Sequence, residues 1–428
     1  MISIPIHALY RALAALRSPE LRGRIGRLAA LFGLAFLVMS SYGLARPASE
    51  SLFLAAYSSH FLPWVWLAVA VAAGLAAGTF NRYALQLSLV RLFTFAILIS
   101  VGLLVLLLTA QHAGLPGVPF LLYVWKDVYI MVLVEIFWSF ANLVFSVSAA
   151  RWLYGLFLLG GSCGSVTGNL CAGLLAKHWG TQAGLWLVVP VLVSAGAATQ
   201  LLARKLGAGY VPKPPQQAPA RLRDNWKLLR SSSYLTLLVA LIATIQIVIT
   251  LVDYQFNVVL EVAYPQMDTR TQIIGKVYAS IEGFSIVLQF LSGPVLRLIG
   301  VPATLIAIPC ALATALGYFL VAPRFATMLV AKIASKSLDY SIFRAAKEIL
   351  YIPLSYAEKT QGKAMIDILA YRAAKGGGSA LLLVLPSLSG QSAVGMLALA
   401  LVAVWLVIVS IVVKRYRGAT ATAAPAPK

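Results

Sequence analysis

Charged residues are scarce in this chain, and acidic residues are the scarcest. Only 11% of the 428 residues are charged, and 13 aspartates and glutamates stand against 34 lysines and arginines. A soluble protein of this length needs far more charge on its surface, so the composition argues against a soluble protein. In place of charge, 61% of the residues are hydrophobic, and the mean hydropathy is +0.87.

Sequence features that would indicate an enzyme or a motor are also missing. No GxxxxGKS/T phosphate loop, nucleophile–base set or metal-ligand spacing occurs. The three cysteines, Cys163, Cys171 and Cys310, fall in apolar segments, so we expect inert buried thiols. No apolar stretch followed by a small-residue cleavage site stands at the start, so no removable signal peptide is expected. We predict no enzymatic activity, no cofactor and no metal.

Hydrophobic runs long enough to cross a bilayer recur along the whole chain. A transmembrane helix needs about 20 mainly apolar residues. The sequence therefore predicts an all-α polytopic membrane protein with twelve transmembrane helices. The twelve runs are centred near residues 38, 71, 100, 133, 163, 192, 246, 283, 311, 340, 376 and 403.

One long polar stretch, residues 207–225, divides these runs into two groups of six. It is rich in proline, alanine, glutamine and bases, which is typical of a flexible linker. A 6+6 arrangement is the plan of major-facilitator-like transporters, whose substrate site lies between the halves near the bilayer midplane. The predicted divisions are a basic cytoplasmic amino terminus at 1–26, a six-helix bundle at 27–204, a cytoplasmic linker at 205–232, a second six-helix bundle at 233–416 and a disordered tail at 417–428.

The net charge of +21 is distributed as in a membrane protein rather than as in a nucleic-acid-binding protein. If the amino terminus is cytoplasmic and the spans alternate, 22 lysines and arginines lie on the cytoplasmic side. Three lie outside, namely Lys177, Arg270 and Arg324. This positive-inside asymmetry predicts cytoplasmic amino and carboxyl termini. We expect a monomeric protein of the bacterial inner membrane that contacts anionic lipids and binds no nucleic acid.

The other nine bases and eight of the acids lie at membrane depth. Each costs about 2.5–3.5 kcal/mol or more at the centre of a helix, so these groups must face one another or a wet cavity. The bases are Arg46, Lys126, Lys276, Lys332, Lys336, Arg344, Lys347, Arg372 and Lys375. The acids are Glu50, Asp127, Glu135, Asp253, Glu282, Asp339, Glu348 and Asp367.

Bases of the tenth and eleventh spans share faces when each helix is drawn at about 100° per residue. One arc of about 80° in the tenth span holds Lys332, Lys336, Asp339, Phe343 and Lys347. Arg344 and Glu348 occupy the adjacent flank, and one face of the eleventh span holds Lys363, Asp367, Tyr371 and Lys375. These faces predict a central cavity whose carboxyl-terminal half is basic enough to hold an anion. Interhelical ion pairs that fix packing or gate transport are the alternative.

Earlier spans carry further polar and small residues. Arg46 and Glu50 are spaced i, i+4 around Pro47, which we expect to break the first span and expose backbone groups to the cavity. Acids such as Asp253 have a second interpretation as proton carriers, because burial disfavours a charged carboxylate. Glycines of the fifth span recur at three- or four-residue spacing, as at Gly164 and Gly168, which predicts close packing against a neighbouring helix.

Three motifs occur in the order and spacing of one known family. The stretch from Lys332 to Ser379 contains YSIF at 340–343, KE at 347–348 and YIPL at 351–354. It continues with Lys359, GKA at 362–364, ID at 366–367 and KGG at 375–377. The stretch from Phe137 to Asn142 reads FWSFAN, and Leu251 to Asp253 reads LVD. In these motifs the chain resembles the nucleotide transporter family of plastids and obligate intracellular bacteria, the ATP/ADP translocases. The resemblance implies a facilitator-like fold and a cavity that handles anions.

Three positions depart from the family pattern. Ser49 stands where the family has a lysine thought important for the nucleotide, and Leu143 stands where a glutamate follows the FW-x-FAN motif. Asp253 is one methylene shorter than the family's usual glutamate. The resemblance is therefore strongest in the carboxyl-terminal half, and strict ATP-for-ADP exchange is not carried over with it.

We predict a secondary active transporter or antiporter that moves a nucleotide or another phosphorylated or carboxylated anion by alternating access. A proton-coupled exporter of a larger amphipathic metabolite and a transport-inactive partner or receptor protein are the alternatives. The predicted substrate-binding residues are Lys332, Lys336, Lys347, Lys363, Lys375, Arg46 and Asn142. The predicted coupling or gating residues are Glu50, Asp127, Glu135, Asp253, Glu282, Asp339 and Asp367.

Overall fold

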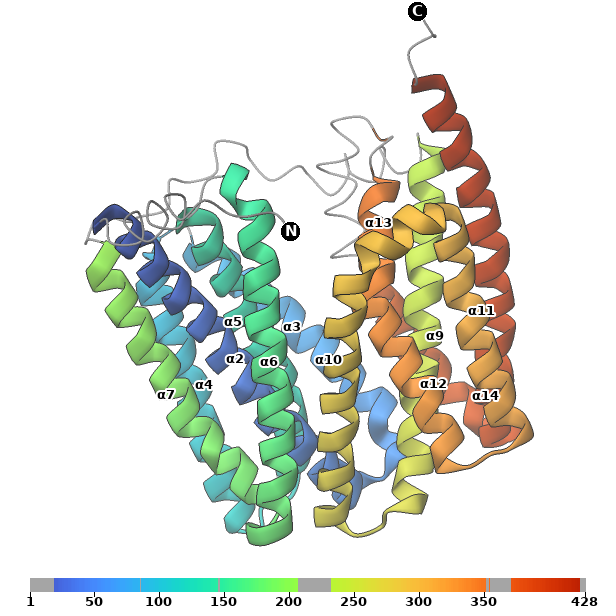
Figure 1. The fold of residues 1–428 in the computed structure, drawn as a ribbon. Coiled ribbons are helices and arrows are strands. Elements are labelled where there is room, and N and C mark those ends of the chain that lie inside the picture. Colours follow the sequence, from blue (N-terminus) through green and yellow to red (C-terminus); the bar gives the residue numbers. More distant parts are fainter. Residues whose placement is uncertain are drawn as a thin grey trace, which may run out of the picture.

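The computed structural model describes residues 19–84, 86–144, 147–206, 232–351, 354 and 371–423. In these ranges all regular structure is helical, and Figure 1 shows two bundles side by side. The N-terminal half contains α2 (Pro19–Tyr57), α3 (Leu62–Ala84), α4 (Leu89–His112), α5 (Val118–Val144), α6 (Val147–Trp179) and α7 (Thr181–Leu206). The C-terminal half contains α9 (Ser233–Ala263), α10 (Met267–Leu298), α11 (Gly300–Val321), α12 (Phe325–Leu338), α13 (Arg344–Leu350) and α14 (Tyr371–Ala423). Two short elements are the 3₁₀ turn η1 (Ser59–Phe61) and the π-helix η2 (Asp339–Phe343).

Successive helices run in alternate directions, so their ends define two faces of the molecule. α7 ends at Leu206 and α9 begins at Ser233 on one face, which we call the linker face. α2 ends at Tyr57 and α6 ends at Trp179 on the opposite face, which we call the far face. In Figure 1 the linker face is at the top and the far face at the bottom.

All twelve predicted span centres fall on described helices, which confirms the polytopic all-α prediction. In the described ranges, nine helices are long and apolar enough to cross a membrane by length and composition alone. The spans outside that set are α5, the continuous α12–η2–α13 segment and the first part of α14. These three segments carry Lys126, Asp127, Lys332, Lys336 and Lys375, so each brings charge to membrane depth.

Helix α14 contains two spans, although its helical assignment is unbroken over 53 residues. A straight helix of that length would extend about 80 Å, far more than the roughly 30 Å hydrocarbon core. Gly378 packs on Thr250 in the middle of α9, and Gly395 packs on Leu320 at the far-face end of α11. Arg415 then donates to Ser233 on the linker face, so the chain reverses between Gly378 and Gly395.

Close packing of α2 against α6 depends on the glycines of α6, as the sequence predicts. A Cβ atom at Gly164 would collide with the backbone carbonyl of Phe36, and one at Gly168 would collide with that of Ser40. Small residues allow such backbone contact between membrane helices, where dispersion and polar contacts drive association. The packing role predicted for these glycines is confirmed.

The predicted break of the first span at Pro47 is wrong. Helix α2 continues through Pro47 to Tyr57. Proline removes one backbone donor, and in a membrane helix the packed neighbours and local adjustments tolerate that loss. Arg46 and Glu50 therefore stay on one helical face, one turn apart, and form an ion pair of 3.2 Å.

The tenth span is not a uniform α-helix, and the face predicted for it is wrong at its end. A π-helix at Asp339–Phe343 separates α12 from α13. A π turn closes i→i+5 hydrogen bonds and so takes up more residues than an α turn, which rotates every following residue. Phe343 consequently packs in the core against Trp405, with ring centroids 6.3 Å apart, and Lys347 does not share the face of Lys336.

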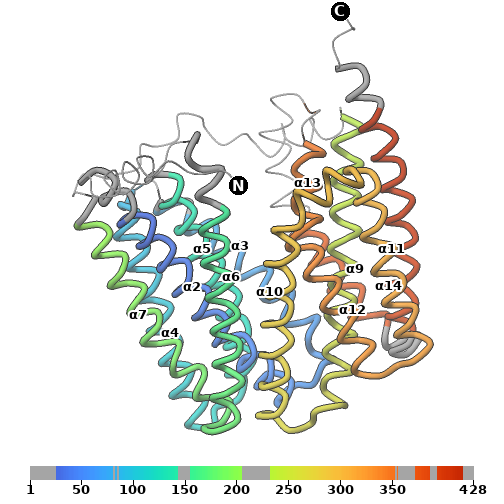
Figure 2. The backbone as a smooth tube through the Cα atoms, in the orientation of Figure 1, coloured from blue at the N-terminus to red at the C-terminus, as the bar shows by residue number. Residues whose placement is uncertain are grey.

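The two halves contact each other at the far face, and Figure 2 shows their backbones closest there. The backbone and hydroxyl of Thr181 both donate to Asp268, at 2.8 and 2.7 Å. The hydroxyl of Ser51 donates to the carbonyl of Met267 at 2.7 Å. Gly275 lies against the backbone of Asn169 in the other half. These contacts close the far face of the protein.

Candidate functional site

A cavity of about 590 Å³ lies between the two halves. This volume falls within the roughly 300–1,000 Å³ that small-molecule sites occupy. Near the far face its lining includes Trp66 and Tyr123, which are joined by a 2.8 Å hydrogen bond from the indole to the phenol oxygen. Toward the linker face it includes Trp138, Phe157 and Arg344. The cavity therefore begins on the closed far-face contacts and extends toward the linker face.

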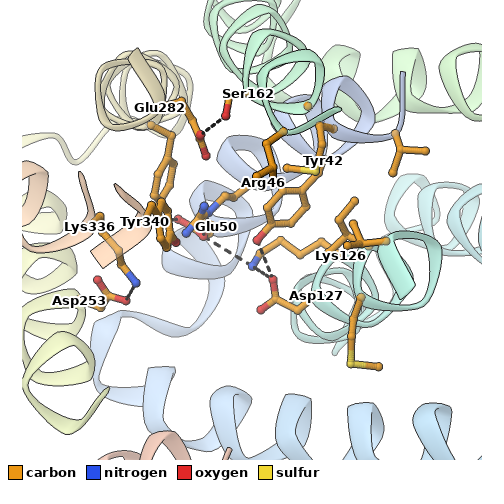
Figure 3. A pocket seen from close by; sticks show the side chains of 18 of the residues that line it. Tyr42, Arg46, Glu50, Lys126, Asp127, Ser162, Asp253, Glu282, Lys336 and Tyr340 are labelled. Atoms are coloured by element: carbon orange, nitrogen blue, oxygen red, sulfur yellow. Dashed lines mark hydrogen bonds and ion pairs between the residues drawn. The ribbon is translucent and has the colours of Figure 1, made fainter. Parts of the chain in front are cut away.

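The floor of the cavity is an ion-pair network in the N-terminal half (Figure 3). The Lys126 ammonium lies 2.9 Å from Asp127 Oδ1 and 3.5 Å from Glu50 Oε1. Glu50 also accepts from Arg46 Nε at 3.2 Å. Lys126 is 1% exposed, and a base so deeply buried requires such carboxylates. The i, i+4 residues Arg46 and Glu50 are thus paired, and so are the sequence neighbours Lys126 and Asp127.

Tyr278 of α10 joins this floor to the C-terminal half. Its hydroxyl donates to Glu50 Oε2 at 3.2 Å, and the Arg46 guanidinium carbon lies 3.5 Å from its ring centroid. A cation over a buried aromatic face is attracted by the ring's negative potential. A second link between the halves, from Ser162 to Glu282, measures 3.4 Å and is also drawn in Figure 3.

Asp253 holds the two lysines of α12 in the C-terminal half. Its Oδ1 atom lies 2.7 Å from Lys332 Nζ and its Oδ2 atom lies 2.8 Å from Lys336 Nζ. Lys332 is 1% exposed, whereas Lys336 borders the cavity at 8% exposure. One carboxylate thus contacts two adjacent ammonium groups, one through each oxygen.

Positive charge exceeds negative charge around the cavity as a whole. Among the described residues, its bases are Arg46, Lys126, Lys332, Lys336, Arg344 and Lys375. Its carboxylates are Glu50, Asp127, Asp253 and Glu282. Within the described part of the chain, Lys375 and Arg344 form no ion pair. The surplus of two positive charges in a low-dielectric site favours an anionic ligand.

The two walls of the cavity differ in chemistry. In the C-terminal half, the lining residues that the structure describes are all polar or charged: Thr250, Asp253, Asn257, Tyr278, Glu282, Gln289, Lys332, Lys336, Tyr340, Arg344 and Lys375. Above the charged floor, the N-terminal half instead presents mainly apolar side chains: Ala35, Val38, Met39, Ile130, Met131, Val134, Phe137, Trp138, Phe157 and Leu158. A ligand with one anionic part and one apolar part would fit both walls.

The cavity includes eight of the predicted site residues. They are Arg46, Glu50, Asp127, Asp253, Glu282, Lys332, Lys336 and Lys375. Four others lie outside the cavity lining, namely Asn142, Lys347, Glu135 and Asp339, and both Asn142 and Glu135 are exposed. Lys363 and Asp367 lie outside the described residues.

Three cavity residues that add charge or join the two halves are not among the predicted site residues. Lys126 and Arg344 are recognisable in the sequence as charges at membrane depth, but periodicity does not place Arg344 on the cavity face. Tyr278 gives no signal, because an uncharged tyrosine within an apolar span has no distinguishing pattern. Ser49, where the resembling family has lysine, is fully buried and does not line the cavity.

Comparison with known proteins identifies the family. Residues 120–416, more than half of the chain, match the family model described as TLC ATP/ADP transporter. The chain belongs to this family. Membership confirms the predicted resemblance, and it confirms the prediction of an integral membrane protein acting as a secondary transporter of anionic solutes.

Curated relatives of the chain are named as carriers rather than enzymes. The ADP,ATP carrier protein 1 of Chlamydia pneumoniae is 25% identical over 352 residues, which cover 69% of this chain and 68% of that one. The chloroplastic ADP,ATP carrier protein 1 of Arabidopsis thaliana is 28% identical over 326 residues, 67% of this chain and 52% of the relative. The ADP,ATP carrier protein 3 of Rickettsia bellii is 23% identical, with 60% of each chain covered. The matches thus span from about half to two thirds of these relatives.

Solved structures confirm the fold. A mutant of the nucleoside transporter NupG superposes with a TM-score of 0.71 at 12% identity, covering 90% of this chain and 99% of that one. A bacterial homologue of the iron transporter ferroportin, described in an inward-facing state, gives 0.69 at 13% identity, covering 91% and 99%. At such identities the likeness concerns the fold alone, and it confirms the major-facilitator-like arrangement of the TLC chain.

Proposed function

We propose that this chain carries a nucleotide, or a phosphorylated anion of similar build, across the membrane by alternating access. One observation carries the proposal: among the described residues, six bases and four carboxylates line a single cavity between the two halves. Such an excess of buried positive charge is costly unless an anion offsets it during transport.

Lys336 and Lys375 are the proposed ligands of the anionic group. Lys375 borders the cavity and forms no ion pair within the described ranges, so a bound phosphate could contact it directly. Lys336 shares Asp253 with Lys332 and also borders the cavity, where a phosphate oxygen would reach it. Charge-assisted hydrogen bonds of this kind are roughly twice as strong as neutral ones.

The apolar wall of the N-terminal half is the proposed contact for the rest of the solute. Trp138 places an aromatic side chain at the cavity, and Met39 and Met131 place flexible, polarizable side chains there. A nucleobase is planar and apolar on its faces, so it suits this wall better than an aliphatic dicarboxylate does. The names of the relatives, ADP,ATP carriers, support the same choice.

The described conformation has a closed far face, and we propose that the cavity opens at the linker face. The distribution of Lys and Arg supports a cytoplasmic linker face, which makes this an inward-facing state in a bacterial inner membrane. Transport then requires the far-face contacts at Thr181, Ser51 and Tyr278 to break while the linker face closes. A monomer suffices for this cycle, because both halves belong to one chain.

A second candidate is proton-coupled export of a larger amphipathic metabolite, which the extended apolar wall favours. In that case Asp253 would exchange protons, and its two lysine partners would regulate the exchange. Asp253→Asn separates the candidates. It abolishes the dependence of flux on a proton gradient if the carboxylate carries protons, and leaves any such dependence unchanged if it only orients the lysines.

The test of the leading proposal is transport by purified protein in proteoliposomes. Labelled ATP, ADP, pyrophosphate and a dicarboxylate are offered outside, with unlabelled solute inside. We expect saturable ATP or ADP uptake that is stimulated by internal nucleotide and falls about tenfold or more in Lys336→Ala and Lys375→Ala. Arg297→Gln, which alters an exposed base outside the cavity, is the matched control. If both lysine variants left the uptake of every anion unchanged, the site assignment would be wrong.

A further inference from the structure

Arg344 lines the cavity on the face where the helical periodicity of the sequence predicts Lys347. At about 100° per residue, Arg344 lies about 80° around the helix from Lys336, whereas Lys347 lies only about 20° away. In the structure Arg344 lines the cavity and Lys347 does not. The cavity is thus lined by Arg344, which the periodicity places on the flank of the helix. It is not lined by Lys347, which the periodicity places on the face of Lys336.

The π-helix at Asp339–Phe343 explains the exchange. If it takes up one residue beyond the α-helical count, each later residue turns back by about 100°. Around the helix axis, Arg344 then lies about 20° from Lys336, and Lys347 lies about 80° from it. The inward-facing ring predicted for Phe343 turns by the same amount, which agrees with its packing against Trp405 in the core.

Contacts with α10 hold the π-helix in place. The amide of Gln289 donates to the carbonyl of Tyr340 at 3.5 Å, and the hydroxyl of Ser337 donates to the carbonyl of Ile281 at 3.3 Å. Within the helix itself, the hydroxyl of Ser341 donates to the carbonyl of Ser337. Gln289 of the neighbouring helix thus satisfies a backbone acceptor of the π-helix, and Ser337 ties the preceding turn to the same neighbour. The distortion is therefore a built feature of the span.

We propose that Arg344 is a further anion-binding residue, oriented by this π-helix at the linker-side part of the cavity. It is exposed, and within the described ranges it forms no ion pair, so its guanidinium is available to a phosphate. Arginine offers two parallel donors to phosphate oxygens, which a lysine cannot reproduce. Arg344 would meet the anion before the deeper Lys336 and Lys375. This inference rests on the proposed transport of phosphorylated anions.

Uptake kinetics of labelled ATP in proteoliposomes test the assignment. Arg344→Gln is expected to raise KM about three- to tenfold with kcat within about twofold, because an accessible charge contributes to capture more than to the later steps. Arg344→Lys should recover part of the loss. The KM difference should shrink as ionic strength rises, since salt screens an accessible charge. A structural role alone would produce neither the recovery by lysine nor the salt dependence.

Two comparisons keep the result decisive. Lys347→Gln tests the residue that an uninterrupted α-helix would choose, and we expect its KM to change less than that of Arg344→Gln. Arg297→Gln controls for the loss of a base near the linker face. An unchanged KM in Arg344→Gln, or an equal or larger effect in Lys347→Gln, would overturn the inference while leaving the transport proposal intact. Absence of uptake by the wild type with every phosphorylated anion would instead contradict the proposed function.

Discussion

The guanidinium carbon of Arg46 lies 3.5 Å from the ring centroid of Tyr278, and this contact joins the two halves at the floor of the cavity. The same tyrosine donates its hydroxyl to Glu50, the ion-pair partner of Arg46. One residue of the C-terminal half therefore contacts both members of a pair in the N-terminal half. The far face cannot open without separating these three groups.

Two replacements of Tyr278 should open the far face to different extents. Tyr278→Phe keeps the ring under Arg46 but loses the hydrogen bond, which contributes about 0.5–1.5 kcal/mol, so the open population should rise about two- to tenfold. Tyr278→Ala loses both contacts and should raise it further. The measurement is the rate of maleimide labelling of Ser59→Cys, a buried far-face position, with the three native cysteines replaced by alanine. Equal rates in all three proteins would mean that this contact does not hold the far face closed.

A methyl group placed between the halves should also shift the equilibrium between the closed and the open far face. A Cβ atom at Gly275 would collide with the backbone carbonyl of Asn169 in the other half, whereas a Cβ atom at Gly283 of the same helix meets nothing. Gly275→Ala should therefore increase far-face labelling of the Ser59→Cys reporter, and Gly283→Ala should not. Indistinguishable variants would show that α10 and α6 do not meet as closely as described.

Packing within the N-terminal half gives a stability prediction with its own control. Gly164→Ala should destabilise the protein by about 1–3 kcal/mol, because α2 and α6 must move apart to admit the methyl group. Gly155→Ala on the same helix meets open space and should be neutral or slightly stabilising, since alanine favours the helix. Thermal unfolding in detergent measures both changes. A lower Tm for Gly155→Ala than for Gly164→Ala would contradict the described packing.

Removal of the Asp253 carboxylate, which Lys332 and Lys336 share, should destabilise the C-terminal half, and a bound anion should restore part of the lost stability. Asp253→Asn removes the carboxylate that contacts the ammonium groups of both Lys332 and Lys336, and loss of one partner of a buried ion pair costs about 3–5 kcal/mol. We expect a markedly lower Tm and a larger stabilisation by added ATP than in the wild type. Asp253→Glu should stay near the wild type in both respects. An unchanged Tm in Asp253→Asn would show that the two lysines are not held as described.

The sequence alone is sufficient to predict the helical membrane fold, because length and hydropathy dominate the free energy of a transmembrane segment. Even the spans with more charged residues, such as α5, are recognisable by position between clearer neighbours. Local ion pairs such as Arg46–Glu50 are predictable too, since a regular helix fixes i, i+4 neighbours.

What the sequence does not reveal depends on departures from regular geometry and on contacts between the halves. A 100° periodicity presumes an unbroken α-helix, so the π-helix misplaces Phe343, Arg344 and Lys347 together. The role of Tyr278 depends on where α10 meets α2, which no local pattern encodes. Continuity of α2 through Pro47 likewise depends on packing by neighbouring helices.

Equilibrium binding to the purified protein tests the central claim, a cavity with one anion-binding wall and one apolar wall, most directly. The Kd values of ATP, pyrophosphate and adenosine are compared in the wild type, in Lys375→Ala and in Trp138→Ala. The account predicts that ATP binds more tightly than either fragment, that Lys375→Ala weakens ATP and pyrophosphate but not adenosine, and that Trp138→Ala weakens ATP and adenosine but not pyrophosphate. Adenosine binding as tightly as ATP, or no binding of any phosphorylated ligand, would contradict it.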